Sequence, residues 1–170
     1  KKPPKDMPQI AKSRPFGELR KFDDWHIDAA SFDDATPLQD ELSKRLRRAY
    51  YACVSYIDHL VGELLKTLVE VGAESNTVVT FWGDHGFLLG EHGAWCKHSM
   101  FELASRVPIT IRVPGKTDKG LSTDHIIELT DLFPTLAEVA GLPPIDHCPK
   151  QSRNITLCTE GRSFAHLIEN

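Results

Sequence analysis

One long stretch between residues 42 and 68 constrains the fold more than any other part of the sequence. Apolar residues recur in it every three or four positions, which is the period of one helix face. These positions are Leu42, Leu46, Ala49, Cys53, Ile57, Leu60, Leu64 and Leu68. Thr36 and Pro37 read as an N-cap followed by proline at the first helical position, and Gly72 is a natural stop. The pattern predicts a long helix, with an interruption expected near Gly62.

A short apolar strand is predicted directly after this helix, at residues 77–82. It is apolar almost throughout, which is typical of a strand covered on both faces in a parallel sheet. Helix, short turn and buried strand together form the second half of a βαβ unit. We expect a second strand at 109–113, a short helix at about 132–140 with Pro134 in its first turn, and the start of another helix at 161–168. The order of elements indicates an α/β fold.

Composition limits the function classes. The chain has 170 residues, of which 41% are hydrophobic and 26% charged, so it has the balance of a globular domain. A formal net charge of -4 argues against a nucleic-acid groove or a polybasic membrane surface, and the basic run at 44–48 reads as a solvated helix face. Residues 1–35 have no sustained period and are expected to be irregular. The sequence starts at Lys1 without an initiator methionine, and we expect a segment of a longer protein.

The run at 81–97, FWGDHGFLLGEHGAWCK, carries the residues with chemical potential. Asp84 and His85 offer an oxygen and an imidazole nitrogen to one cation. On a regular strand two neighbours point to opposite faces, so they share a metal only if the backbone turns, which Gly83 and Gly86 permit. A closed site needs at least two further ligands. The alternative is a turn aspartate that caps the following residues beside a surface histidine.

Three further histidines lie within reach by sequence, but their spacing does not aim them at Asp84; they are His59, His92 and His98. Lys97 is either an idle surface lysine or a cation that pairs with a bound anion beside the glycine-rich loop. Glu91 and His92 are expected to order this loop. We expect Trp95 to pack rather than to face a sugar ring.

The cysteines bear on the compartment. Cys148 and Cys158 flank a polar segment that holds the sequon Asn154-Ile155-Thr156. A sequon between two cysteines favours a glycosylated or disulfide-closed loop in a protein of the secretory pathway. Cys53 and Cys96 are expected to be small buried apolar residues outside disulfides.

Taken in order, these residues carry a family likeness. The motifs are Asp84-His85-Gly86, the Leu89-Gly90-Glu91-His92-Gly93 run, Trp95, Lys97, Phe101-Glu102 and Arg106-Val107-Pro108. This ordered set resembles the sulfatases of the alkaline-phosphatase-like superfamily, and within them the branch that acts on iduronate. The likeness runs from about residue 40 to the C-terminus and more faintly before it. The resemblance implies a partial alkaline-phosphatase-like α/β fold, with a long helix and part of a central mixed sheet.

The resemblance also implies roles for individual residues. Asp84 and His85 match a pair of calcium ligands, and Lys97 matches the lysine that holds the substrate sulfate. Calcium prefers oxygen ligands, so the imidazole keeps zinc and manganese as alternatives. Phe87 stands where the iduronate branch has a tryptophan near the substrate. The step from Cys148 to Cys158 is similar to a disulfide loop of the same branch, and the localisation implied is lysosomal or secreted.

The family's nucleophile is a formylglycine made from cysteine in a Cys-x-Pro-x-Arg motif, which this sequence does not contain. The resemblance therefore implies a C-terminal portion that needs the missing N-terminal part and is inactive alone. We expect an irregular segment at 1–35, the C-terminal part of the catalytic domain at 36–142, and the start of a C-terminal region at 143–170. The expected reaction is removal of 2-O-sulfate from iduronate in heparan or dermatan sulfate. The rivals are another sulfatase, a phosphonate or phosphodiester hydrolase, and a non-catalytic binding protein on the same scaffold.

Overall fold

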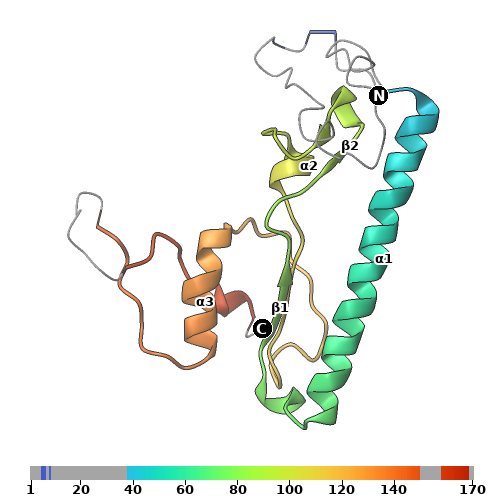
Figure 1. Cartoon of the computed structure of the whole chain (residues 1–170). Helices are drawn as coiled ribbons and strands as arrows, with labels where there is room; N and C mark the ends of the chain where they lie inside the picture. Colours follow the sequence, from blue (N-terminus) through green and yellow to red (C-terminus); the bar gives the residue numbers. More distant parts are fainter. Residues whose placement is uncertain (1–4, 7, 9–37, 150–157, 169–170) are drawn as a thin grey trace. The chain divides into compact units, whose positions relative to one another are not determined.

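The computed structural model describes residues 5, 6, 8, 38–149 and 158–168 (Figure 1). The expectation of an irregular segment at 1–35, and the predicted cap at Thr36 and Pro37, thus fall almost entirely outside the described residues. The chain divides into two compact units. One contains residues up to Lys66 together with Gly83–Pro108, and the other contains Thr67–Trp82 together with Ile109–Asn170.

The predicted long helix is present as α1, Asp40–Glu70. It runs without a break through Gly62, so the expected interruption is wrong; one glycine costs a helix only about 1 kcal/mol relative to alanine. The helix ends at Glu70, and Gly72 terminates it as predicted. This glycine has a φ of 70°, its N–H donates to the Val69 carbonyl at 2.9 Å, and the Ala73 N–H donates to the Leu68 carbonyl at 3.1 Å. These two bonds satisfy the last carbonyls of the helix in a Schellman arrangement.

In the first unit a small antiparallel hairpin packs against the start of α1. Its strands are β2, Leu88–Leu89, and β3, Trp95–Cys96, joined by the 3₁₀ turn η6, Glu91–Gly93. Leu46 of α1 forms a buried cluster with Trp95 and Cys96. These strands were not predicted, because two residues are too few to establish an alternating pattern.

A second cluster in the same unit joins the hairpin to the short helix α2, Glu102–Ser105. Its buried members are Leu88, Ala94 and Ala104. The Gly86 N–H donates to the Ala104 carbonyl at 2.9 Å. A Cβ at Gly86 would collide with the Leu103 carbonyl oxygen, so only glycine permits the backbone to approach so closely here.

In the second unit the predicted strands form a two-stranded sheet. A 3₁₀ turn, η5 (Glu74–Asn76), precedes β1, Val79–Trp82, which pairs with β4, Ile109–Arg112. The pairing is antiparallel, with Val79 opposite Arg112 and Trp82 opposite Ile109, so the expected parallel arrangement is wrong for the part of the chain described. The expectation of a strand buried on both faces is also wrong there, since Phe81 and Trp82 are exposed. An apolar run of residues indicates that a strand tends to be buried. It does not indicate whether the neighbouring strand is parallel or antiparallel.

The predicted short helix is confirmed as α3, Leu132–Val139, and the 3₁₀ turn η7, Leu129–Asp131, leads into it. Pro134 lies in its first turn, as expected. The tail forms only the 3₁₀ turn η8, Ala165–Leu167, in place of the predicted start of a helix. Buried Thr135 of α3 holds this tail, because its hydroxyl donates to the Asp131 carbonyl at 2.7 Å and accepts the Phe164 N–H at 3.0 Å.

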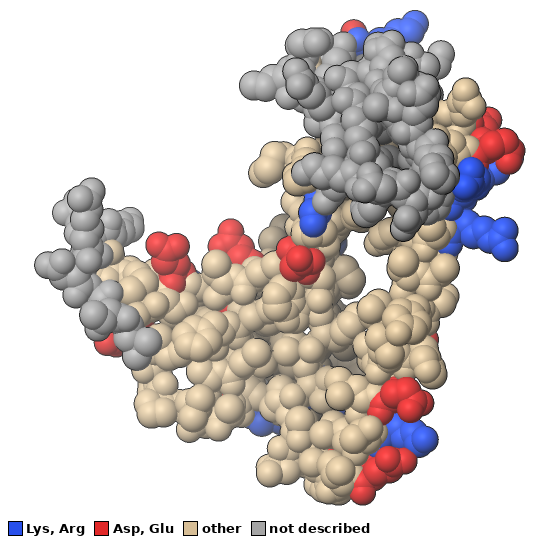
Figure 2. All heavy atoms as spheres, viewed as in Figure 1, with Lys and Arg blue, Asp and Glu red and all other residues tan. Residues whose placement is uncertain are grey.

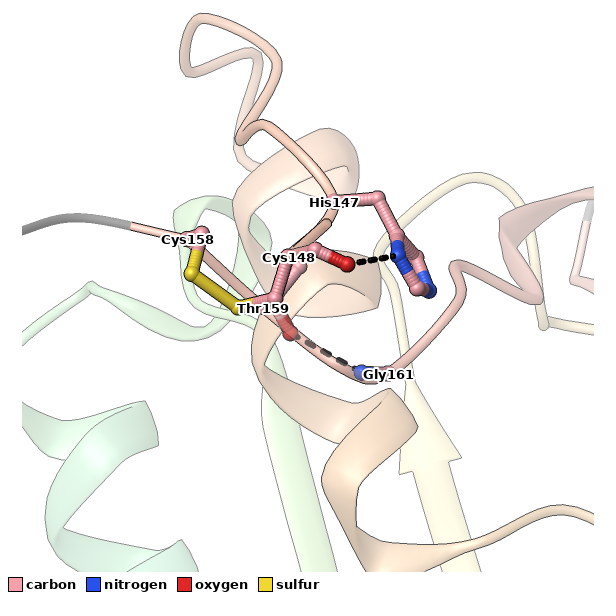
Figure 3. The surroundings of a disulfide bond; sticks show 5 residues. All are labelled: His147, Cys148, Cys158, Thr159 and Gly161. Atoms are coloured by element: carbon pink, nitrogen blue, oxygen red, sulfur yellow. Dashed lines mark hydrogen bonds between the residues drawn. A yellow bond between two sulfur atoms is a disulfide. The ribbon is translucent and has the colours of Figure 1, made fainter. Parts of the chain in front are cut away.

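Cys148 and Cys158 form a disulfide, with their Cα atoms 4.9 Å apart (Figure 3). Backbone bonds continue past it: the Cys148 N–H donates to the Thr159 carbonyl and the Thr159 N–H donates to that of Asp146. The predicted pairing is therefore present, whereas the sequon residue Asn154 lies outside the described residues. Cys96 is buried as expected, but Cys53 is exposed on α1, which corrects that prediction. No described helix combines the length and apolar character needed to cross a membrane.

Candidate active site

The backbone turns directly after β1, within residues 83–86, and brings Asp84 and His85 to the same side. The His85 N–H donates to Asp84 Oδ1 at 3.0 Å, and His85 Nε2 lies 3.5 Å from Asp84 Oδ2. The Asp84 side chain is largely exposed and that of His85 is half-buried. Two neighbouring side chains that a strand would separate thus face one another, as sharing a cation requires.

The tautomer of His85 follows from its second contact. His85 Nδ1 lies 2.9 Å from the Gly86 carbonyl oxygen, which can only accept, so Nδ1 carries the proton in this hydrogen bond. In the neutral ring Nε2 then presents its lone pair toward the Asp84 carboxylate. Two electron-rich groups at this separation favour a cation between them. A backbone carbonyl that fixes the far nitrogen of a histidine is also the usual outer-shell arrangement of metal-binding imidazoles.

The pair supplies two ligand positions and no more. Among the described residues there is no group of three or more His, Cys, Asp or Glu side chains that could hold a metal ion. His59 is exposed on α1, and the ring of His92 stacks on that of Phe101 with centroids 4.3 Å apart. The donor set fits a divalent cation, but only as one part of a larger coordination shell.

Lys97 follows the last residue of β3. It is half-buried, and its carbonyl accepts the Ser99 N–H at 2.7 Å. The preceding residue, Cys96, has a φ of 68° although it is not glycine. This left-handed residue changes the direction of the chain at the point where the strand would otherwise set the orientation of Lys97 by alternation.

The loop residues take the structural parts expected of them. Glu91 Oε2 accepts the Leu89 N–H at 2.7 Å, and Trp95 is only 5% exposed, so it packs rather than offering an open ring face. Phe87 is half-buried and stacks on Tyr50 of α1 with ring centroids 5.2 Å apart. One side of the Phe87 ring is thus engaged by the helix.

Two features were not anticipated from the sequence. A hollow of about 440 Å³ is lined by His92, Glu102, Leu103 and Arg106, and its two charged residues form an ion pair at 2.8 Å. Arg47, which the charge pattern assigned to a solvated face, donates from Nε to the Leu89 carbonyl at 2.8 Å. No local pattern signals a bond between residues 42 positions apart.

The family profile that matches is that of the sulfatases, over residues 9–142. The chain belongs to the sulfatase family. The resemblance seen in the Asp84-His85-Gly86 and Lys97 motifs is thereby confirmed, and with it the alkaline-phosphatase-like α/β fold class.

Among curated relatives, iduronate 2-sulfatase of Mus musculus is 35% identical over 191 residues, covering 98% of this chain and 34% of the relative. The chain spans about a third of the length of the mouse and human iduronate 2-sulfatases that it matches. Other members of the family match as well.

Several solved structures share the fold, and two illustrate the likeness. The phosphonate monoester hydrolase SpPMH from Silicibacter pomeroyi superposes with a TM-score of 0.68 at 24% identity, covering 84% of this chain and 25% of that one. BT4656, solved in complex with its substrate D-glucosamine-2-N,6-O-disulfate, superposes with a TM-score of 0.58 at 32% identity, covering 69% of this chain and 22% of that one.

Proposed function

We propose that this chain is the C-terminal portion of a sulfuric ester hydrolase that removes 2-O-sulfate from iduronate in heparan or dermatan sulfate. The observation that carries the chemistry is the Asp84–His85 pair, in which His85 Nε2 lies 3.5 Å from Asp84 Oδ2 while Nδ1 is held by the Gly86 carbonyl. The choice of iduronate is supported by the 35% identity to an iduronate 2-sulfatase over 98% of the chain.

In this proposal Asp84 and His85 bind a metal, with Ca²⁺ first and Zn²⁺ or Mn²⁺ as alternatives. A bound divalent cation would neutralise charge that develops on the sulfate oxygens. Lys97 binds the sulfate as a point charge and holds it beside these ligands. Phe87, supported from behind by Tyr50, contributes to the substrate-binding surface with its half-buried ring.

We further propose that the partner of this chain is the N-terminal part of the same protein, which supplies the remaining metal ligands and a formylglycine nucleophile. The support is the surface of α1. Nine apolar side chains between residues 51 and 65 lie over about 220° of the helix circumference at 100° per residue. They are Tyr51, Cys53, Val54, Tyr56, Ile57, Leu60, Val61, Leu64 and Leu65.

This arc is about twice as wide as the stripe with which a surface helix faces a single core. All of its members except Val61 are exposed here, and Leu64 reaches 70%. In the view of Figure 2 the charged side chains of α1 gather toward its two ends. A helix that is apolar on more than one side is expected to pack against other protein segments on more than one side. Without the covering part, the chain lacks half of the active site and is inactive.

The domain division and the compartment follow the same proposal. Residues 36–142 form the C-terminal part of the catalytic domain, and 143–170 begin a C-terminal region closed by the Cys148–Cys158 disulfide. A structural disulfide favours an oxidising compartment, which agrees with a lysosomal or secreted glycoprotein carrying sugar at Asn154.

A second candidate is a phosphonate or phosphodiester hydrolase on the same scaffold, favoured by the superposition on SpPMH at a TM-score of 0.68. Another sulfatase with a different sulfate ester is a variant of the first proposal. A non-catalytic binding protein is the remaining alternative. The three differ in what they turn over, so one substrate panel separates them.

The test uses the full-length protein and three substrates: a disaccharide with non-reducing 2-O-sulfated iduronate, a 6-O-sulfated glucosamine and a phosphonate monoester. We expect turnover of the first substrate only, its loss after chelation, and its return with one of Ca²⁺, Zn²⁺ or Mn²⁺. Asp84→Asn should lower kcat/KM about 100- to 1,000-fold, because a metal contributes several kcal/mol of charge stabilisation. The matched control is Asp118→Asn on an exposed loop. Metal-independent turnover, or an equal effect of both variants, would disprove the metal site.

A further inference from the structure

We propose that Arg47 is a positioning residue of the sulfate site, which sets the direction of Lys97 through the β2–β3 hairpin. This inference rests on the proposed role of Lys97 in sulfate binding. Arg47 belongs to α1, whereas Lys97 follows β3, and the link between them is formed by backbone and ring contacts within one compact unit.

The first contact of Arg47 is to the outer edge of the hairpin. The Gly90 N–H donates to the Ala94 carbonyl at 2.9 Å, so the next pair, Leu89 and Trp95, is the non-hydrogen-bonded pair of the ladder. The N–H and C=O of Leu89 therefore point away from β3. Both are satisfied by side chains: Arg47 Nε donates to the Leu89 carbonyl at 2.8 Å, and Glu91 Oε2 accepts the Leu89 N–H at 2.7 Å.

The second contact is to the opposite strand of the same hairpin. The guanidinium carbon of Arg47 lies 5.6 Å from the centroid of the Trp95 ring, within the range of a cation–π interaction. The planar guanidinium thus contacts both strands, β2 through a hydrogen bond and β3 through the indole. A lysine in its place would have no planar group with which to make both contacts.

The turn between the strands is shaped around this side chain. Gly90 has a φ of 105°, and a Cβ there would lie 2.8 Å from Arg47 Nη2 and 3.3 Å from Trp95 Cζ2. The positive φ of this turn favours glycine for its conformation, and any side chain there would displace the Arg47 guanidinium. The turn, the guanidinium and the indole thus lie in direct contact with one another.

The hairpin passes this constraint on to Lys97. Trp95 and Cys96 are buried with Leu46, and Cys96 adopts a left-handed conformation that costs a non-glycine residue roughly 1–2 kcal/mol. Such a residue persists only where its surroundings determine it. Because Cys96 directly precedes Lys97, its φ of 68° sets the direction in which Lys97 leaves the strand. A hairpin loosened by loss of Arg47 would let Cys96 return to an extended conformation and turn Lys97 away.

Inorganic sulfate binding by the full-length protein tests this inference, measured by calorimetry and, where turnover is seen, as competitive inhibition. We compare wild type with Arg47→Ala, Arg47→Lys, Lys97→Ala and the control Arg48→Ala, which removes the same charge from the next, exposed position. We expect Arg47→Ala to weaken sulfate binding about 10- to 100-fold, the range seen when outer-shell partners of a ligand are removed. Arg47→Lys should recover only part of this loss, and Arg48→Ala should bind within about twofold of wild type.

The outcomes separate the inference from the function on which it rests. If wild type binds no sulfate, or Lys97→Ala binds it as well as wild type, the proposed sulfate site fails and the inference fails with it. If Lys97→Ala loses sulfate while Arg47→Ala and Arg47→Lys bind like Arg48→Ala, the site stands and the positioning role is overturned. Should Arg47→Ala not fold, Arg47→Lys carries the test. A variant with lowered thermal stability but unchanged sulfate affinity would make Arg47 merely structural.

Discussion

The two parts of α1 differ sharply in what surrounds them. At its start, Ser43 and Leu46 are buried, and Leu46 packs with Trp95 and Cys96 of the hairpin. From Tyr51 onward ten consecutive residues are exposed, although many of them are apolar. Both parts belong to one uninterrupted helix of 31 residues, so helical propensity does not separate them. The difference lies in what each part packs against: the first part packs on the hairpin of its own unit, whereas residues 51–60 are exposed.

The same contrast separates the joint between α3 and the tail from the proposed metal site. Thr135 is fully buried, and its hydroxyl both donates and accepts a hydrogen bond within the unit. Asp84 and His85 have the right geometry toward one another but provide two ligands where a cation needs at least four. Regions whose packing and hydrogen-bond partners all lie within the chain are called complete here, and mutations in them are therefore expected to lower the free energy of unfolding. Mutations in the incomplete regions, which lack some of their partners in this chain, should change stability or binding only in the full-length protein.

The largest effect is expected at the packed end of α1. Trp95→Ala should lower the free energy of unfolding by about 3–5 kcal/mol, because it removes a buried indole and leaves a cavity beside Leu46. Denaturant unfolding of the full-length protein followed by circular dichroism measures this value. Leu121→Ala, at an exposed position, is the control and should change stability by less than about 0.5 kcal/mol. Equal, small effects of both variants would mean that the hairpin cluster is not a core.

A somewhat smaller effect is expected on the exposed face of α1, and it tests whether that face is covered in the full-length protein. Leu64→Ala should cost about 2–3 kcal/mol there, the value for a buried leucine with partial relaxation, although Leu64 is 70% exposed in this chain. His59→Ala, on the polar side of the same helix, should stay within about 0.5 kcal/mol. Hydrogen exchange of the helix amides gives a second readout. If Leu64→Ala is as mild as His59→Ala, the N-terminal part does not cover this face.

Sequence patterns predicted those features that depend on local chemistry. The helix period, the Gly72 stop, the strand at 109–113 and the helix containing Pro134 were all visible in the order of residues. The direction of β1 was not, because an apolar strand looks the same whether its neighbour is parallel or antiparallel. At Gly62 local propensity gave a wrong prediction, because the helix-forming residues around one glycine outweigh its low helix propensity.

For the candidate site, the sequence identified the residue types but not their arrangement. Asp84 and His85 were interpreted as candidate ligands that would need a turn to face one another; the structure contains that turn, and their role as ligands stays a prediction. The role of Arg47 could not be predicted. An arginine on a helix looks the same in the sequence whether it faces solvent or contacts Leu89 and Trp95. The left-handed conformation of Cys96 could not be predicted either, because a cysteine in the sequence gives no sign of a positive φ. These are tertiary facts, which depend on segments that meet only after folding.

The smallest effect is expected at the joint between α3 and the tail, the complete region of the second unit. Thr135→Val keeps the shape of the side chain but removes its hydroxyl, which leaves the Phe164 N–H without its acceptor and removes the side-chain bond to the Asp131 carbonyl. An unsatisfied buried group costs about 1–3 kcal/mol, so the variant should unfold at correspondingly lower denaturant concentration. Thr110→Val on the exposed side of β4 is the matched control and should be neutral. Because both positions belong to the second unit and the proposed ligands belong to the first, sulfate binding should be unchanged in both. Loss of sulfate binding in Thr135→Val alone would show that the tail is coupled to the site, and that the division into complete and incomplete regions is too simple.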